Sequence, residues 1–403
     1  MLLKHIKILL LNLAIVALLG VLLRYKSIFP LPFVHQKFLL HSHSHFAFTG
    51  WVTQSFYLLI LYITYCNNKK NSLKKFEWLL IANLITAYGM LLSFMLLGYH
   101  WVSIFFSTLS VVISYCFTVL VWQLFAKKRI KAIYINWIKA ATFFNVLASL
   151  GTCYLAYLMM VKSTFQNQYL ASLYFYLHFE YNGWFSFGCL GLFYFIANKQ
   201  NIIFSNSRTI YLLYLFACIP AYGLSVLWWP IETWGYVLSV LAAIAQMFAL
   251  YLFTKDLKVI YEHLKPMIST AAMVLFTISY GAFALKNIFQ LLTLIPFVHH
   301  FAFGIRSVII GYLHLIFLGM TSLFLLGFML NEFKDFFISR NIKAMLFFAA
   351  FVILNEILLF SQSIAAFFNE LLPFSNQLLF IVAIGLFTSA VIFFPSNNTS
   401  KSK

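Results

Sequence analysis

The chain has 403 residues, of which 63% are hydrophobic and only 9% are charged. This composition lies outside the range of soluble globular domains. A formal net charge of +18 would suit nucleic-acid binding, but the lysines and arginines form short clusters between long apolar runs. That placement excludes a nucleic-acid partner and is typical of membrane topology signals.

Apolar runs long enough to cross a bilayer as helices recur along the whole chain. They are continuous rather than alternating, which argues against a β-barrel. We therefore predict an all-α, polytopic membrane protein with about 12 transmembrane helices and no soluble domain. The predicted spans are residues 7–24, 41–66, 76–98, 102–126, 136–161, 170–197, 209–228, 234–254, 267–291, 306–330, 343–363 and 375–394.

The positive charges between these spans predict the orientation of the chain. They concentrate in alternate connections, and the richest two are 69–75 and 127–131. Because cytoplasmic loops carry an excess of lysine and arginine, we expect both termini to be cytoplasmic. The membrane expected for such a protein is a bacterial-type inner (plasma) membrane, and the lipid bilayer is its first partner.

The second predicted span opens with three histidines, His41, His43 and His45. His41 and His45 are i,i+4 neighbours on one helical face, whereas His43 points roughly the other way. Neutral imidazoles bind haem iron, copper or zinc. The alternative interpretation is a polar cap that bonds to lipid headgroups. Gly50 follows His45 by five residues and removes bulk where a flat macrocycle or a neighbouring helix must approach closely.

The sixth predicted span repeats this pattern with His178 and Gly183. An imidazole inside a membrane is costly unless it has a partner. Glu180 lies two residues after His178 and therefore points off its face. This carboxyl either supplies protons to a redox site or pairs with a buried donor.

The pattern occurs a third time in the tenth predicted span, with His314 and Gly319. Arg306 stands at the outer end of this span, and Lys286 lies near the outer end of the ninth. Either cation suits the propionate of a bound haem, and anchoring to lipid headgroups is the alternative for both. Glu356 follows Asn355 in the eleventh span, where a structural hydrogen bond is expected.

The three histidines are separated by 133 and 136 residues. This register predicts a single transmembrane domain, 1–403, with three pseudo-repeated four-helix arcs, at about 1–131, 132–265 and 266–403. Each histidine then lies on the second helix of its arc, about 5–15 Å below the outer membrane boundary at a helical rise of about 1.5 Å per residue. A second repeated motif, Pro-Phe-Val-His, precedes two of these helices, at Pro32–His35 and Pro296–His299.

The layout and the motifs together resemble subunit I of the haem–copper oxidase superfamily, with its nitric oxide reductases and NnrS-type membrane haem proteins. The segment from His43 to Gly50 resembles the His-x-His-x-x-x-x-Gly motif of the second NnrS helix. Tyr312 to Gly319 is similar to the tenth helix of the superfamily. His178 to Gly183 is similar to the nitric oxide reductase helix that supplies a metal ligand, with asparagine where a glutamate would stand.

The resemblance implies a low-spin b-type haem with His45 and His314 as axial ligands, and a second site, for copper or another metal, faced by His178. The full set of candidate metal ligands is His41, His43, His45, His178 and His314, and the candidate cofactor-binding residues are His45, His314 and Arg306. Tyr312 stands where the high-spin haem ligand is expected, and residues 209–228 contain no histidine. The binuclear centre is therefore predicted to be incomplete.

We therefore expect a membrane haem protein at the outer leaflet that transfers electrons, or that binds or converts a small gas such as O2 or NO. Oxidoreductase activity stays open at this point. The expected partners are haem and a respiratory-chain subunit or electron donor. The alternative is a non-haem membrane carrier or copper- or zinc-handling protein that uses the outer histidines. It predicts bound metal without porphyrin.

Overall fold

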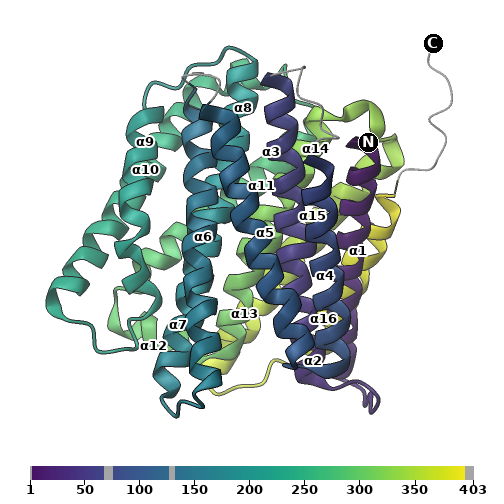
Figure 1. Ribbon diagram of the computed structural model, residues 1–403, viewed down its shortest axis with the longest axis vertical. Coiled ribbons are helices and arrows are strands. Elements are labelled where there is room, and N and C mark those ends of the chain that lie inside the picture. Colours follow the sequence, from purple (N-terminus) through teal and green to yellow (C-terminus); the bar gives the residue numbers. More distant parts are fainter. Residues whose placement is uncertain (1, 68–75, 127–131, 395–403) are drawn as a thin grey trace. The chain divides into compact units, whose positions relative to one another are not determined.

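The computed structural model describes residues 2–67, 76–126 and 132–394. The regular elements in these ranges are helices (Figure 1). The two richest cationic runs that predict the orientation, 69–75 and 127–131, lie outside the described residues. In chain order the helices are α1 (Leu2–Lys26), α2 (Gln36–Phe46), η1 (Ala47–Thr53), α3 (Gln54–Asn67), α4 (Glu77–Leu97), α5 (Trp101–Ala126), α6 (Ile133–Met160), α7 (Gln166–His178), η3 (Phe179–Phe185), α8 (Ser186–Lys199), α9 (Ser207–Cys218), η4 (Pro220–Ser225), α10 (Thr233–Leu264), α11 (Thr270–Leu292), α12 (Pro296–Gly304), α13 (Arg306–His314), η5 (Leu315–Ser322), α14 (Leu323–Glu332), η6 (Lys334–Phe336), α15 (Ser339–Phe367) and α16 (Ser375–Ile392).

Within the described residues, 10 helices are long and apolar enough to cross a membrane. They match ten of the predicted spans, so the prediction of an all-helical, multi-pass membrane protein is confirmed. The count of twelve is not confirmed. These ten helices are Leu2–Lys26, Gln36–Asn67, Glu77–Leu97, Trp101–Ala126, Ile133–Met160, Thr233–Leu264, Thr270–Leu292, Arg306–Glu332, Ser339–Phe367 and Ser375–Ile392.

The other two predicted spans are not among these ten helices, for different physical reasons. Residues 170–197 lie in a continuous helical stretch formed by α7, η3 and α8, but several polar side chains lower its hydropathy. Residues 209–228 do not form one helix: α9 ends at Cys218, and a short 3-10 helix, η4, begins at Pro220. Proline lacks an N–H group and clashes with the preceding turn, so one continuous helix does not form over these residues, and the predicted span is not confirmed.

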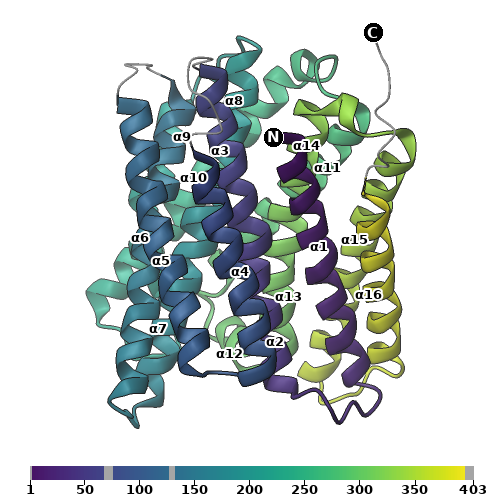
Figure 2. The ribbon, with the colours of Figure 1, turned by 45° about the vertical axis from the view of Figure 1, so that its right-hand side comes forward.

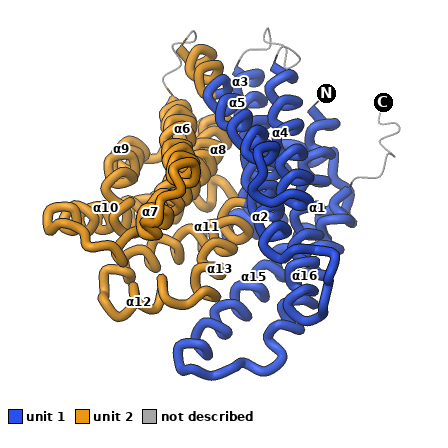
Figure 3. The backbone as a smooth tube through the Cα atoms, turned by 60° about the horizontal axis from the view of Figure 1, so that its bottom comes forward, with its two compact units in different colours: residues 1–117, 269–278, 322–403 blue, residues 118–268, 279–321 orange. Residues whose placement is uncertain are grey.

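The chain forms two compact units, coloured separately in Figure 3. Unit 1 contains residues 1–117, 269–278 and 322–403, and unit 2 contains residues 118–268 and 279–321. Three of the four boundaries fall inside α5, α11 and η5, and the fourth lies between α10 and α11. The division into three repeats stays a prediction.

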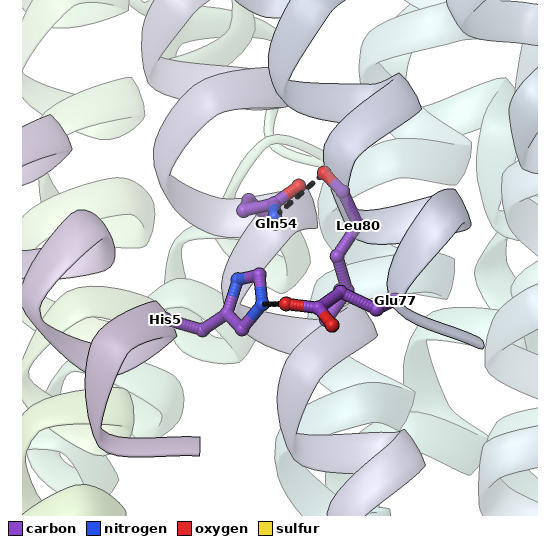
Figure 4. Close-up of polar contacts among 4 residues, drawn as sticks. All are labelled: His5, Gln54, Glu77 and Leu80. Atoms are coloured by element: carbon purple, nitrogen blue, oxygen red, sulfur yellow. Dashed lines mark hydrogen bonds and ion pairs between the residues drawn. The ribbon is translucent and has the colours of Figure 1, made fainter. Parts of the chain in front are cut away.

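In unit 1, α16 lies against both α1 and α15, and α2 with η1 packs between α1 and α4 (Figure 2). Polar side chains join these helices. His5 of α1 donates from Nε2 to Glu77 Oε1 of α4 at 3.0 Å, and Gln54 of α3 donates to the Leu80 carbonyl at 3.1 Å (Figure 4). These contacts fix α1 and α3 against α4.

In unit 2, α6 runs along α7, η3 and α8, and α10 packs against α9 and η4. Small side chains allow the second of these contacts to be close. Its buried core consists of Ala217, Ala221, Leu224, Ala242 and Ala243. Small residues at helix interfaces are the usual way in which membrane helices approach each other.

Candidate functional site

Each of the three histidine–glycine motifs coincides with a π-helix. His45 is the penultimate residue of α2, which runs directly into the π-helix η1. His178 ends α7 directly before the π-helix η3, and His314 ends α13 directly before the π-helix η5. The motif glycines lie inside the three π-helices. Since π-helical turns are rare and occur frequently at functional sites, these segments are the best candidates for one.

Side-chain donors stabilise the π-helix of unit 1. The buried Asn12 of α1 donates from Nδ2 to the Gly50 carbonyl at 2.5 Å, and Tyr88 donates to Asn12 Oδ1 at 2.7 Å. Asn83 of α4 donates to the Thr49 carbonyl at 3.1 Å. A wider turn disturbs the regular pattern of backbone hydrogen bonds, and an unpaired carbonyl in the membrane is costly. These amides offset that cost.

Serine hydroxyls serve the same purpose in unit 2. Ser186 donates to the Tyr181 carbonyl in η3 at 2.6 Å. Ser279 of α11 donates to the Met320 carbonyl in η5, also at 2.6 Å. All three π-helices are thus held by specific side-chain donors as well as by packing.

The motif glycines allow close packing, as predicted. A Cβ atom on Gly183 would lie 2.4 Å from Phe144 Cβ of α6, and one on Gly319 would lie 3.1 Å from Ala282 Cβ of α11. At Gly50 the nearest atom belongs to Phe46 on the same helix, at 2.6 Å. Gly183 and Gly319 therefore allow a neighbouring helix to approach closely, which is one of the two roles that the sequence suggests for these glycines.

His45 lies among aromatic rings in unit 1. Its ring stacks on Phe94 of α4, with centroids 4.2 Å apart and planes within 3° of parallel. Its side chain is partly exposed, and no described residue forms a hydrogen bond with its ring nitrogens. Both nitrogens are therefore available for a metal or for another ligand.

His41 shares this environment, whereas His43 does not. The His41 ring lies 6.2 Å from Phe94 and 4.7 Å from Tyr99, and its buried Nε2 has no partner among the described residues. His43 Cε1 lies 3.7 Å from the position of a Cβ on Gly20, so this ring faces α1. The prediction that His41 and His45 share a face opposite His43 is confirmed.

His178 in unit 2 is completely buried and fully hydrogen-bonded. Its Nε2 donates to the Cys218 carbonyl at 2.8 Å, which fixes the tautomer because a carbonyl can only accept. Nδ1 then accepts from Asn182 Nδ2 at 3.0 Å and from Ser225 Oγ at 3.1 Å. A metal could bind His178 only after one of these bonds breaks.

The Cys218 carbonyl is available to His178 because of the helix break. In a continuous helix this oxygen would accept from the amide of Tyr222, but that amide donates at 3.1 Å to the carbonyl of Ile219, the residue directly before η4. The change from α-helix to 3-10 helix at Pro220 therefore leaves the Cys218 carbonyl free to accept from His178.

His314 and Arg306 belong to α13 in unit 2. His314 Nδ1 donates to the Ile310 carbonyl at 2.8 Å, which leaves the lone pair of the ring on Nε2. Arg306 is the exposed first residue of the helix. Tyr312, at the position where the resemblance expects a histidine, has a buried hydroxyl without a partner among the described residues, and its ring packs edge-on against Tyr181.

The intramembrane charges have separate environments. Asn355 donates to Glu356 Oε1 at 3.0 Å, so the expected structural bond is confirmed. Glu180 is buried in η3, and its Oε2 has no hydrogen-bond partner among the described residues. The Lys286 side chain is only 2% exposed, which does not fit anchoring to lipid headgroups.

Four other histidines, His35, His100, His299 and His300, are less enclosed. His35 precedes α2 and packs its ring on Phe38, and His100 is exposed. His299 and His300 lie side by side in α12 with centroids 4.3 Å apart. Partial burial, and then the neighbouring His300 ring, lower the pKa of His299.

In the described ranges, no group of three or more His, Cys, Asp or Glu side chains could hold a metal ion. A haem with two axial histidines needs only two protein ligands, so this finding leaves the haem hypothesis open. No protein-family model matches the chain, and no curated protein matches its sequence.

Several residues of these sites were missed in the sequence. Asn12 and Asn83 are polar residues inside apolar spans, and that signal alone marks them as partners of some buried group. Phe94 and Ser225 carry no such signal. Their roles depend on which helices become neighbours.

Proposed function

We propose that this protein is a membrane haem protein in which His45 is an axial ligand of a b-type haem iron. The observation that carries this proposal is the π-helix after each of the three motif histidines. Inserting one residue into a helix turns the following side chains by about 100° relative to a regular α-helix. Such turns persist where function requires that geometry.

The environment of His45 fits an iron ligand. An imidazole without hydrogen bonds is costly in an apolar membrane protein, and a metal ion supplies the missing partner. The parallel ring of Phe94 supports one face of the imidazole and limits its rotation. His41, with its unpartnered Nε2, is a candidate ligand for a second metal, and copper is the favoured ion.

The hydrogen bond from His314 Nδ1 to its own helix also suits a metal ligand. Metal-binding histidines commonly donate their other N–H to a backbone carbonyl, which fixes the tautomer and the ring orientation. The sequence predicts His314 as the opposite axial ligand and Arg306 as a propionate partner. A bis-histidine haem supplies a one-electron centre, so we propose electron transfer, or the binding or conversion of a small gas such as O2 or NO, at an inner membrane.

The test is the visible spectrum of protein produced with ample haem and purified in detergent. The wild type should show a Soret band with the split bands of a low-spin ferrous haem. His45→Ala should lose the low-spin signal, and His314→Ala should do the same if the predicted pairing holds. His100→Ala, which changes an exposed histidine, is the matched control and should retain the full spectrum.

Two results would contradict the proposal. If wild-type protein shows no Soret band after haem-replete expression, the protein does not bind haem. If the His45→Ala variant keeps a complete bis-histidine spectrum, His45 is not an axial ligand. Copper or zinc in the purified protein without porphyrin would instead support the metal-carrier alternative.

A further inference from the structure

A buried, largely polar face of α11, in unit 2, contains Lys286, which has no ion-pair partner in the described part of the chain. Phe283, Lys286, Asn287 and Gln290 are spaced by three and four residues, so they share one side of the helix. All four are buried, and Lys286 is only 2% exposed. An ammonium inside a membrane protein is expensive and marks a functional site by default.

No carboxylate neutralises Lys286 among the described residues. Its amine lies over the ring of Phe283, 5.7 Å from the centroid, and its charge interacts with the Cys218 thiol and the His178 ring. His178 is held neutral as a tautomer by its donor bond to a carbonyl and its two acceptor bonds. A thiol, a neutral imidazole and an aromatic face reduce the free-energy cost of burying the ammonium, but none of them carries the negative charge that would neutralise it.

The neighbouring amides are also incompletely paired. Asn287 donates to the Phe283 carbonyl at 2.8 Å, but its Oδ1 and the Oε1 of Gln290 are buried without partners in the described part of the chain. Buried polar atoms are normally satisfied. An ammonium has three donors, enough for an anion and for nearby amide oxygens.

Irregular backbone lies next to this face. Cys218, which interacts electrostatically with Lys286, ends α9 directly before the break at Pro220. Irregular backbone at membrane depth occurs where it is buried in protein or lines a cavity. In transporters, broken helices commonly flank ion and substrate sites.

We infer that Lys286 forms the binding site of one small monovalent anion. A single negative charge cancels the ammonium, whereas a divalent anion would leave one buried charge uncompensated. Chloride, formate and the carboxylate of a larger molecule share this chemistry. The inference rests on Lys286 and its neighbours and does not require the haem proposal.

The experiment uses the full-length protein in detergent, produced without added haem. Thermal unfolding is measured in sodium formate, sodium chloride and sodium sulfate at equal ionic strength. A ligand that binds only the folded state stabilises it, so formate or chloride should raise the wild-type Tm by about 2–4 °C more than it raises that of Lys286→Met. Sulfate should shift both proteins equally. Lys258→Met, which neutralises an exposed lysine of α10, is the control and should respond like the wild type.

Lys286→Met should fold, because an apolar side chain of similar length removes a buried charge. Equal formate and chloride responses in wild type and Lys286→Met would overturn the inference. Equilibrium dialysis of labelled formate against the wild type needs no variant and should give one bound anion per chain. No saturable binding of either labelled formate or labelled chloride would also overturn it.

Repeating the measurements after haem loading identifies the source of the anion. If a haem propionate occupies the site, loading abolishes the formate response. If a free anion occupies it, the response persists. Both results support the site, and a protein that binds formate but shows no Soret band refutes only the haem proposal.

Discussion

His45 in unit 1 and His178 in unit 2 share a sequence motif and a local backbone, yet their side chains have opposite environments. Both precede a π-helix that contains the motif glycine. The ring of His45 stacks on an aromatic face and has no hydrogen bond from the described residues. The ring of His178 is fully buried and makes three hydrogen bonds.

This difference shows that the motif specifies backbone geometry, whereas the neighbouring helices specify chemistry. The partners of His178 come mainly from the last residue of α9, which offers the Cys218 carbonyl, and from the last residue of η4, which offers the Ser225 hydroxyl. The ring that contacts His45 on α4 is the aromatic side chain of Phe94. We therefore interpret His178 as a structural residue, whose hydrogen bonds hold α7 to α9 and η4, and His45 as the residue available for a ligand.

The largest expected effect follows from replacing the two histidines in haem-free protein. His178→Ala leaves the Cys218 carbonyl and the Asn182 and Ser225 side chains without their partner, which should cost about 3 kcal/mol of stability. His45→Ala removes a stacking contact and should cost about 1 kcal/mol. Unfolding by denaturant in detergent measures both. Equal losses would show that the two rings have the same structural role.

A smaller effect is expected from the motif glycines. Gly183→Ala places a Cβ 2.4 Å from Phe144 Cβ and should cost about 1–3 kcal/mol. Gly319→Ala faces Ala282 Cβ at 3.1 Å and should cost less. Gly304→Ala has no described atom within 4 Å and is the control. Thermal unfolding ranks the three, and a Gly319→Ala loss above that of Gly183→Ala would contradict the packing argument.

The sequence predicts the helices well because span length and hydropathy are local properties. The exceptions are instructive. Pro220 lies inside the predicted span 209–228, and its missing N–H is a visible signal for the break at Cys218. The apolar composition of residues 209–228 nevertheless predicts one continuous span.

The candidate sites are harder to predict because they depend on neighbours distant in the sequence. A π-helix contains the same residues as the α-helix that it replaces, and the donors that stabilise η1 come from Asn12 and Asn83 on other helices. The burial of Lys286 has the same origin: a lysine near the end of a span suits headgroup contact in sequence, and only the packing of α11 encloses it.

Removing the donors of the unit 1 π-helix should have a moderate effect. Asn12→Leu keeps the size of the side chain but leaves the Gly50 carbonyl unpaired, at a cost of about 1–2 kcal/mol. Tyr88→Phe removes only the bond to Asn12 Oδ1 and should cost about half as much. Hydrogen exchange at residues 47–53 should quicken in Asn12→Leu. Unchanged exchange there would show that packing alone maintains η1.

The smallest expected effect concerns the contact between His5 and Glu77, which joins α1 to α4 in unit 1 (Figure 4). The Glu77 side chain is 29% exposed, so solvent screens this pair, and such pairs are worth at most about 1 kcal/mol. Glu77→Gln retains an oxygen that accepts from His5 Nε2 and removes only the charge, so it should cost less than about 0.5 kcal/mol. A double-mutant cycle with His5→Phe, repeated at low and high salt, separates the two contributions. A coupling energy that disappears in salt would identify a charge interaction; one that persists would identify a hydrogen bond. A coupling energy that persists in salt would show that the His5–Glu77 contact is a hydrogen bond of the same kind as those of His178. Both units would then be held by such bonds, and His45 would differ from His178 only in having its ring nitrogens available for a ligand.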